Sequence, residues 1–266
     1  MSVIESKITI NSKSFNQNEK DHLKLIDEFR GLEKKIADNS ARSKDKFEQR
    51  GQLLPRERLK RLIDPERFWL PLSTLAGYKI GDDDGEKNIG WGNGPGGIGY
   101  VSGVRCMIGV SDSGIKGGSG SAMGVEKGLR NAQIIFENKL PLIQLIESAG
   151  ANLLRQTDMF IKGGRSFANL SKMSAMGIPT IGVVHGSSTA GGAYQTGLSD
   201  YIIVVKNKSK IFLAGPSTHN AWEILLCKSH EEISSAPPAS LETIATLPSG
   251  ITVINLNYPK PYEMQK

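Results

Sequence analysis

The sequence predicts an α/β fold in which helices cover both faces of a mostly parallel sheet, with a helical segment ahead of it. Three observations support this prediction. From about residue 104, apolar β-branched runs alternate with amphipathic stretches. Upstream of these runs, apolar residues recur at the spacing of one helical face. The 30 glycines of the 266-residue chain are clustered rather than spread evenly.

The first predicted element is a helix that begins at about Asn18, after a polar tail over residues 1–20 that is expected to be flexible. Apolar residues at spacings of four, three and four share one face of this helix: Leu25, Phe29, Leu32 and Ile36. A second, short apolar stripe follows: Leu59, Leu62 and Ile63. It ends at Asp64, because the residue before a proline avoids the helical region.

The predicted sheet follows a glycine-dense loop over residues 77–99. Strands are expected over 104–112, 140–148, 178–186, 201–206 and 210–215, and helices over 123–138, 165–176 and 191–198. Because the apolar runs are β-branched and separated by helices, the strands are expected to be mostly parallel. Beyond Pro216 the alternation stops, and residues 217–266 are expected to be poorly packed.

Composition excludes several classes of protein. Hydrophobic residues at 38% and charged residues at 23% are typical of a soluble globular domain. The net charge is +6, but basic residues are mixed with acidic ones and do not alternate with aromatic residues, so nucleic acid is not expected as a partner. No apolar stretch approaches the roughly 18 residues of a membrane span. The first residues lack an apolar signal segment, and Glu5 and Glu19 are atypical of a mitochondrial transit peptide, so the cytoplasm is expected rather than the mitochondrial matrix.

Three further patterns give weak or negative signals for a site. Cys106 and Cys227 form no CxxC pair, so neither a disulfide scaffold nor a metal site is expected. Residues 92–97 satisfy GxGxxG, but that motif needs a strand before it and a helix after it, so a mobile loop is expected instead. In KGGSGSAMG, residues 116–124, the backbone of Gly117 and Gly118 either holds an anion at a helix start or forms a plain turn.

A hydrolase is not expected from the serines beside His185. A nucleophile elbow needs GxSxG on a strand-to-helix turn, and the segment after Gly186 does not supply it. Ser187 and Ser188 are expected to cap a helix instead, with His185 at a strand end and Asp200 in no triad.

Two strand-to-helix corners carry almost no reactive side chains: ESAGANLLRQ (147–156) and HGSSTAGGAY (185–194). Gly and Ala allow a ligand to approach main-chain N–H groups closely. Such groups stabilise a developing oxyanion when a reaction passes through an enolate. Tight packing between strand and helix explains the same residues, and the local sequence leaves both interpretations open.

Taken together, several segments resemble the carboxyltransferase (β) subunit of biotin-dependent acyl-CoA carboxylases, in the methylcrotonyl-, geranyl- and propionyl-CoA branch. They are GQLLPRERLKRLIDPERFWLPLSTLAGY, GYVSGVRCMIGVSD, ESAGANLLRQ, GGRSFANLSKMSAMGIPTIGVVHGSSTAGGAY, GLSDYIIVVK and IFLAGP. The resemblance runs from about Asp21 to Pro216. It implies that residues 21–216 form an N-terminal carboxyltransferase lobe, a crotonase/ClpP-like spiral of ββα units preceded by a helical segment.

The resemblance also implies a site. In this family the enolate of biotin, after carboxybiotin releases CO2, takes the α-proton of an acyl-CoA while a backbone oxyanion hole holds the thioester oxygen. Ala149, Gly150 and Ala151 match that hole, although Glu-Ser-Ala-Gly-Ala stands where the family usually has Asp-Ser-Gly-Gly-Ala. The residues expected on the acyl-CoA side are Gly117, Gly118, Arg155, Ala190, Gly191, Gly192 and Ala193.

The resemblance implies partners as well: a biotinylated α-subunit that carries carboxybiotin, an acyl-CoA substrate, other copies of the subunit, and no metal. The family is about twice as long, because a second lobe binds biotin and supplies another oxyanion hole. Here the likeness stops at Pro216, so a truncated or frameshifted product with a divergent tail over 217–266 is expected.

Three functions therefore stay open. The chain is a carboxyltransferase part that is incomplete without a C-terminal lobe, or a non-catalytic remnant that binds acyl-CoA or co-assembles with intact subunits. A crotonase hydratase or isomerase is the third. That chemistry needs acidic side chains at the thioester α and β carbons, and Glu147 is the only acid next to either corner.

Overall fold

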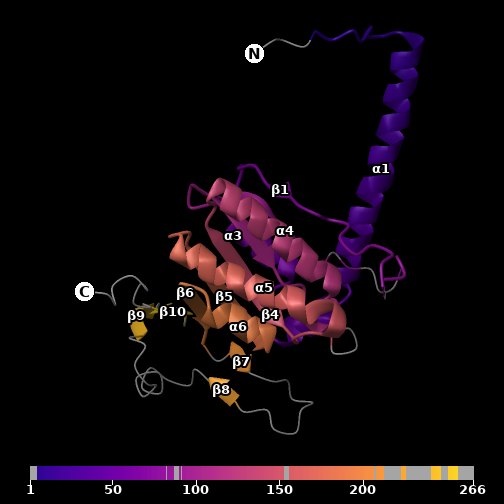
Figure 1. Ribbon diagram of the computed structural model, residues 1–266. Helices are drawn as coiled ribbons and strands as arrows, with labels where there is room; N and C mark the ends of the chain where they lie inside the picture. The colour runs from indigo at the N-terminus through magenta and orange to yellow at the C-terminus, as the bar shows by residue number, and fades with distance from the viewer. Residues whose placement is uncertain are drawn as a thin grey trace.

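A mixed β-sheet forms the centre of the molecule (Figure 1). The computed structural model describes residues 5–81, 83–86, 90, 92–152, 156–206, 208–212, 223–225, 241–246 and 251–256. Its strands are β1 (Leu70–Pro71), β2 (Gly96–Val101), β3 (Val104–Val110), β4 (Leu142–Ser148), β5 (Thr180–Thr189), β6 (Tyr201–Val205), β7 (Lys210–Phe212), β8 (Glu223–Leu225), β9 (Leu241–Thr246) and β10 (Ile251–Leu256). The order across the sheet is β1-β2-β3-β4-β5-β6-β10-β9, and β7 joins the end of β5 and pairs with β8.

The sheet is parallel in its middle and antiparallel at its sides. Strands β3, β4, β5 and β6 run parallel to one another, as the sequence predicts for this region. Strands β1 and β2 pair antiparallel on one side, and β10 and β9 do so on the other. The fold is therefore a mixed α/β arrangement rather than a wholly parallel one.

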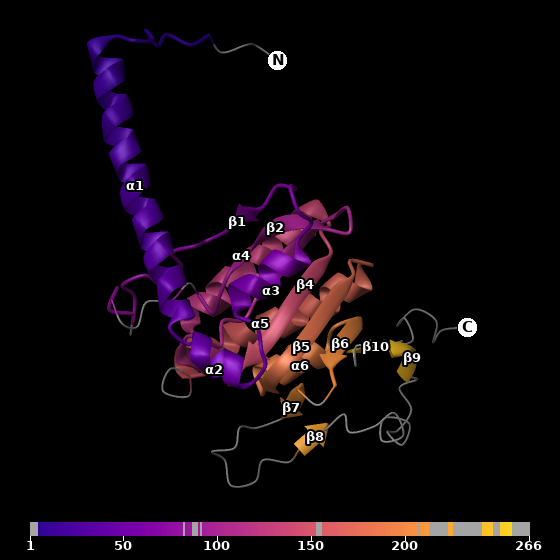
Figure 2. The same ribbon diagram turned by 180° about the vertical axis from the view of Figure 1, so that it is seen from behind.

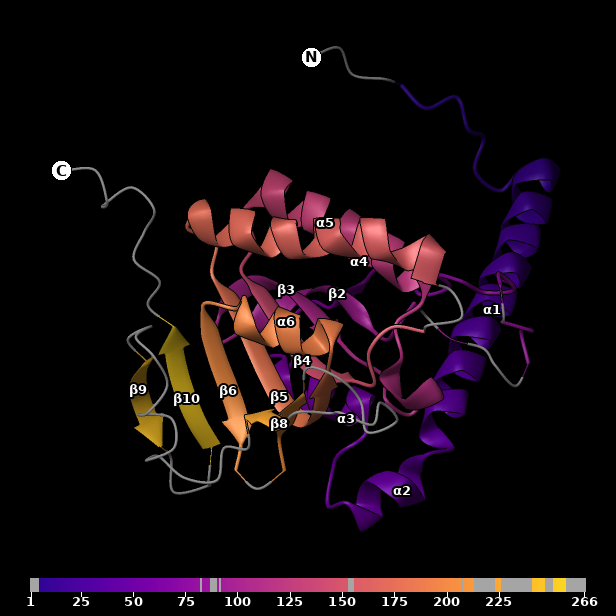
Figure 3. The ribbon, with the colours of Figure 1, turned by 60° about the horizontal axis from the view of Figure 1, so that its bottom comes forward.

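Helices cover the sheet on both faces (Figures 2 and 3). They are α1 (Lys13–Ala41), α2 (Lys44–Gln49), α3 (Pro55–Leu62), α4 (Ala122–Asn138), α5 (Gln156–Ala175) and α6 (Gly191–Gly197), with a short 3-10 turn, η1 (Lys116–Gly118). Helices α4 and α5 lie side by side over one face, while α3 and α2 lie on the opposite side. Helix α1 projects from the body, and its buried residues, Ile36, Asn39 and Ser40, are all near its C-terminal end.

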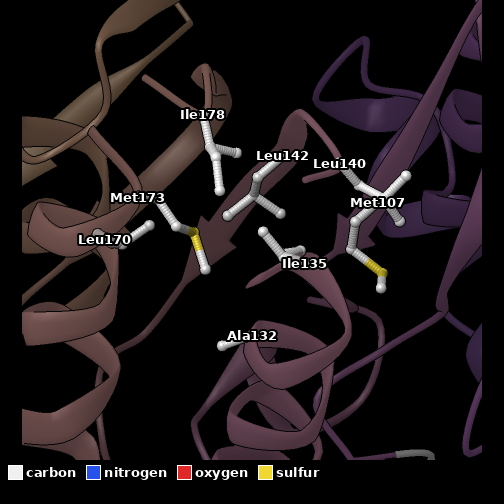
Figure 4. Packing of buried hydrophobic residues seen from close by; sticks show 8 residues of the cluster. All are labelled: Met107, Ala132, Ile135, Leu140, Leu142, Leu170, Met173 and Ile178. Carbon is white, nitrogen blue, oxygen red and sulfur yellow. The ribbon is translucent and has the colours of Figure 1, made fainter. Parts of the chain in front are cut away.

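The sheet divides the core into two apolar layers. Figure 4 shows the layer beneath α4 and α5: Met107, Ala132, Ile135, Leu140, Leu142, Leu170, Met173 and Ile178. On the other face, Leu59 of α3 packs with Cys106, Ile108, Val110, Ile143 and Leu145. Successive residues of a strand point to opposite faces, so both sets of residues in β3 and β4 must be apolar. This is why these strands are continuous apolar runs in the sequence.

Two helices begin earlier than the sequence predicts. Helix α1 begins at Lys13 rather than about Asn18, because the Ser12 Oγ caps it by accepting a hydrogen bond from the Phe15 N–H at 3.2 Å. Residues 13–20 are therefore helical and not part of a tail. Helix α5 begins at Gln156 rather than Arg165 and continues through two glycines, because burial of Met159 in its first turns outweighs the low helix propensity of glycine.

The glycine-dense stretch is anchored rather than free, which corrects the expectation of a mobile loop over its last residues. Strand β2 begins at Gly96, inside the predicted loop. Just before it, the Asn93 carbonyl accepts from the Asp112 N–H at 2.8 Å, and the Gly94 carbonyl accepts from the Lys127 Nζ at 2.9 Å. A Cβ on Gly97 would lie 2.1 Å from the Leu70 carbonyl oxygen, so glycine is required where β1 approaches β2.

The described parts of residues 217–266 extend the sheet. Strand β10 pairs antiparallel with β6, with Val253 opposite Ile203, and β9 forms the next strand outward. An antiparallel hairpin of this kind needs no intervening helix, so it is compatible with the absence of β-α alternation there. The other residues of this segment lie outside the described ones.

Candidate active site

The two glycine corners predicted from the sequence lie against each other. Strands β4 and β5 are parallel neighbours, so their carboxyl ends meet at the same edge of the sheet. Gly150 follows β4, and Ala190 follows β5. A Cβ placed on Gly150 would lie 3.4 Å from the Cβ of Ala190, and one on Gly192 would lie 3.0 Å from the Cβ of Ser148. The structure therefore joins the corners into one surface.

A third glycine turn borders this surface. A Cβ on Gly117 would lie 3.7 Å from the Cβ of Ala149. Gly120 forms a parallel bridge with Ala151, and the Gly120 N–H donates to the Gly150 carbonyl at 2.8 Å. Gly117 is thus next to the corner after β4.

The hydrogen bonds of the first corner show which of its amides already have an acceptor within the protein. The Gly150 N–H donates to the Ser148 Oγ at 3.0 Å, and that hydroxyl donates to the Gly118 carbonyl at 3.2 Å. The Ala151 N–H donates to no acceptor among the described residues. Of the predicted oxyanion-hole residues, Gly150 therefore shapes the turn, while Ala151 offers an available donor.

The second corner has a strained residue at its tip. Ala190 adopts φ 50° and ψ −111°, a conformation that L residues rarely take. Its N–H donates to the Phe212 carbonyl at 2.9 Å, which holds it in place. The next amides, those of Gly191 and Gly192, begin α6 and have no acceptor within the helix. Backbone strain maintained by tertiary contacts is typical of functional sites.

The start of α4 is already capped by protein groups. The Ser121 Oγ accepts from the Gly124 N–H at 3.0 Å, and the Asn93 Oδ1 accepts from the Ser121 N–H at 2.9 Å. The Gly118 N–H donates to the Ile115 carbonyl at 2.9 Å. These amides therefore have acceptors within the protein. Gly117 lies beside Ala149, while Gly118 lies against the Glu147 carbonyl.

Glu147, the only acid next to either corner, is not available as a free acid. Its carboxylate is buried and lies 2.7 Å from the Arg58 Nη2, as an ion pair. The His185 Nε2 is 3.5 Å from the same carboxylate oxygen. Burial, and then the charge of Arg58, lower the pKa of His185 to about 3, so the imidazole is neutral and this contact is not an ion pair. The hydratase or isomerase alternative loses its acid.

The residues that suggested a hydrolase are also separated. Asp200 accepts hydrogen bonds from the Thr180 N–H and Oγ1, both at 2.8 Å, at the beginning of β5. His185 lies further along the same strand, and the buried Ser188 Oγ is 3.3 Å from the Thr196 Oγ1. These residues form no catalytic triad, as expected from the sequence.

A cavity of about 310 Å³ lies beside the first corner. Its wall includes Lys116, Ser119 and Asn152 on the side of the corner, and Ile115 and Met123 among its apolar residues. Arg155, which the family resemblance implies on the acyl-CoA side, lies outside the described residues. Among the residues that the structure describes, no group of three or more His, Cys, Asp or Glu side chains could hold a metal ion. No described helix is long and apolar enough to cross a membrane.

Comparison with known proteins decides the family. Residues 46–253 match the model of the carboxyl transferase domain. The chain belongs to the carboxyl transferase domain family. The matched segment includes both corners, the buried Arg58 and Glu147, and strands β1 to β9 in their full length.

Relatives of this carboxyl transferase domain share its sequence over most of its length. A probable biotin-dependent acyl-coenzyme A carboxylase beta2 subunit of Mycobacterium tuberculosis is 41% identical over 215 residues, 80% of this chain and 40% of that protein. The biotin-dependent 3-methylcrotonyl-coenzyme A carboxylase beta1 subunit of the same organism is 41% identical over 204 residues, 74% of this chain and 37% of that protein.

The solved structure of the P. aeruginosa geranyl-CoA carboxylase beta subunit matches with a TM-score of 0.74 and 50% identity. The match covers 84% of this chain and 42% of that one. The carboxyl transferase domain described here thus spans about two fifths of the length of the proteins it matches. The expected crotonase-type fold, with its helical segment in front, is confirmed by this likeness.

Proposed function

We propose that this carboxyl transferase domain holds the acyl-CoA half of the carboxyltransferase site of a biotin-dependent acyl-CoA carboxylase. The observation that carries the proposal is the close approach of Gly150 and Ala190, which unites two backbone corners at one edge of the sheet. A surface of Gly and Ala leaves room for a thioester to approach main-chain donors. The named relatives supply the reaction class, since they are carboxylase β subunits.

In this proposal the backbone binds and polarises the thioester. The Ala151 N–H and the first amides of α6 donate to its oxygen, and that oxygen gains charge as the α-proton leaves. Loss of one such donor typically costs about 3 kcal/mol of transition-state stabilisation. Carboxybiotin, carried by a biotinylated α-subunit, supplies the carboxyl group and the base. No side chain of the corners needs to act as a base, which agrees with the engagement of Glu147 by Arg58.

The remaining site residues keep supporting roles in the proposal. Gly117, beside Ala149, and Gly118, against the Glu147 carbonyl, border the acyl-CoA. Residues 190–193 line its other side, and Arg155 contacts it just after the first corner. A second carboxyltransferase lobe completes the site, and the complex works in the cytoplasm without a metal in this domain. The acyl-CoA belongs to the methylcrotonyl- or geranyl-CoA class of the named relatives.

The alternative is a domain that binds acyl-CoA, or assembles with other subunits, without catalysing transfer. Its half-site would be the same, so only transfer separates the two functions. The domain spans about two fifths of the length of the relatives that it matches, and for this reason the alternative is tested beside the proposed function.

The test has two stages. Geranyl-CoA and 3-methylcrotonyl-CoA are first titrated into the purified chain by calorimetry, with free CoA as the control. The chain is then mixed with a biotinylated α-subunit and a carboxyltransferase C-terminal lobe, and the transfer of labelled bicarbonate into acyl-CoA is measured. Binding followed by transfer supports the carboxyltransferase, binding alone supports the alternative, and the absence of both refutes the half-site.

A further inference from the structure

The pairing of β4 with β5 changes register just before the two corners. Up to Ile146, which lies opposite Val184, the strands advance together. The next pair is Ser148 with Ser188, so β5 advances from 184 to 188 while β4 advances only from 146 to 148. Such bulges bend a strand and redirect the residues that follow. This one therefore determines where Ala190 falls relative to Gly150.

The side chain of Glu147 occupies the space at this register shift. A Cβ on Gly186 would lie 2.5 Å from the Glu147 Oε1 and 2.8 Å from the Gln52 Nε2. The carboxylate is thus packed against the backbone of the bulged segment, where only glycine leaves room for it. The Gln52 Nε2 also donates to the His185 carbonyl at 3.0 Å, which ties the same segment to the chain before α3.

Arg58 fixes the carboxylate from the other side. Its Nη2 is 2.7 Å from the Glu147 Oε2, and its Nε donates to the Leu53 carbonyl at 2.7 Å. The guanidinium also lies over the ring of Phe47, 5.5 Å from its centroid. The side chains of Arg58 and Glu147 are only 8% and 6% exposed. A buried pair held by this many contacts has little freedom to adjust.

We propose that Arg58 and Glu147 are positioning residues, whose buried ion pair maintains the register shift and so holds Ala190 against Gly150. Glu147 reaches both corners. It precedes Ser148, whose hydroxyl accepts from the Gly150 N–H, and its carboxylate packs on the segment that leads to Ala190. The inference rests on the proposed function for its ligand-binding readout, but the geometry of the corners is measurable without a ligand.

The test compares Glu147→Gln with the double variant Arg58→Met/Glu147→Met. Glu126→Gln is the control, since it breaks the exposed Lys162–Glu126 ion pair on the helical face. Three quantities are measured for each chain: the melting temperature, hydrogen exchange in peptides covering 146–152 and 187–194, and the Kd for geranyl-CoA. Replacing a buried ion pair by apolar residues of similar volume is often neutral or stabilising, so the double variant is expected to fold.

If Arg58 and Glu147 position the corners, substitutions there change hydrogen exchange and ligand binding at the corners independently of the melting temperature of the chain. Glu147→Gln is expected to speed exchange in the two corner peptides and to weaken geranyl-CoA binding about three- to tenfold, the effect of about one hydrogen bond. The double variant is expected to recover the melting temperature but neither the slow exchange nor the affinity. Glu126→Gln should change none of the three quantities.

Two results overturn the inference. In the first, hydrogen exchange in the two corner peptides becomes faster only in those variants whose melting temperature falls. In the second, Glu147→Gln leaves hydrogen exchange unchanged in both peptides. If the unmodified chain binds no geranyl-CoA while Glu147→Gln still speeds exchange only in the corners, the proposed function fails and the positioning role stands.

Discussion

Gly150 and Ala190 lie next to each other across the ends of β4 and β5, although all of α5 and all of β5 separate them in the chain. Each has an unusual backbone: φ is +91° at Gly150 and +50° at Ala190. Both are held by hydrogen bonds, from the Gly150 N–H to Ser148 and from the Ala190 N–H to Phe212. Substitutions at and around these two residues therefore test whether ligand binding at the corners and the stability of the fold depend on the same groups.

Gly150→Ala is expected to destabilise the chain by about 1–2 kcal/mol, because a residue with a Cβ is strained at the positive φ of this position. Urea denaturation measures the free energy of unfolding. Gly128→Ala is the control: Gly128 lies in α4 with open space around it, so alanine should stabilise the helix by up to about 1 kcal/mol. Equal effects of the two substitutions would contradict the special geometry of the corner.

Ser148→Ala is expected to lower the free energy of unfolding by about 1–3 kcal/mol and to weaken geranyl-CoA binding. The hydroxyl links the Gly150 N–H to the Gly118 carbonyl, and its removal leaves both groups without that partner. Ser166→Ala is the matched control, because the Ser166 hydroxyl is exposed and makes only a 3.5 Å contact with the Lys162 carbonyl. The link is disproved if Ser148→Ala and Ser166→Ala have the same Kd.

The lowered pKa of His185 leads us to expect that the folded chain loses stability in acid. Burial, and then Arg58, lower its pKa from 6.5 in the unfolded chain to about 3 in the folded one, so between these values the unfolded state binds the extra proton. The contribution of His185 to stability is complete above pH 6.5 and is lost as the pH falls toward 3. Its slope is at most about 1.4 kcal/mol per pH unit. His185→Gln should reduce the pH dependence of urea unfolding in this range; an unchanged slope would show that His185 is not buried as a neutral group.

Asp200→Ala is expected to reduce stability without affecting the site. The carboxylate accepts from the buried Thr180 at the beginning of β5 and from the exposed Ser174 of α5, so its loss leaves the two Thr180 donors unpaired at a cost of about 1–3 kcal/mol. This end of β5 is opposite to the corners. Calorimetry below the melting transition should therefore give the Kd of the unmodified chain, while Asp200→Asn, which keeps one acceptor, should lose less stability. A change in Kd of more than about threefold, which corresponds to the free energy of roughly one weak hydrogen bond, would show that Asp200 also affects the site.

Much of the fold is determined by the sequence itself. The strands at 104–112, 140–148 and 178–186 were predictable because a parallel strand buried on both faces must be apolar at successive positions. The structure places β3, β4 and β5 there, with shifts of a few residues at their ends. The two corners were predictable for the same reason, since each directly follows one of these apolar runs.

Elements that depend on distant partners were not predictable. Strand β2 is rich in glycine because β1 passes within contact of Gly97, and no local pattern shows this approach. The early start of α5 depends on burial of Met159, which outweighs the glycines that follow. In each case a contact between segments far apart in the chain decides the local conformation.

The site shows the same division. The sequence by itself determined that two corners of Gly and Ala follow neighbouring strands, because strand ends and small residues are local properties. Only the tertiary structure decided that the Gly150 amide is used by Ser148, that Glu147 is bound by Arg58, and that Ala190 meets Gly150. Hydrogen bonds and ion pairs act over a few ångströms, and folding alone brings these partners within that distance.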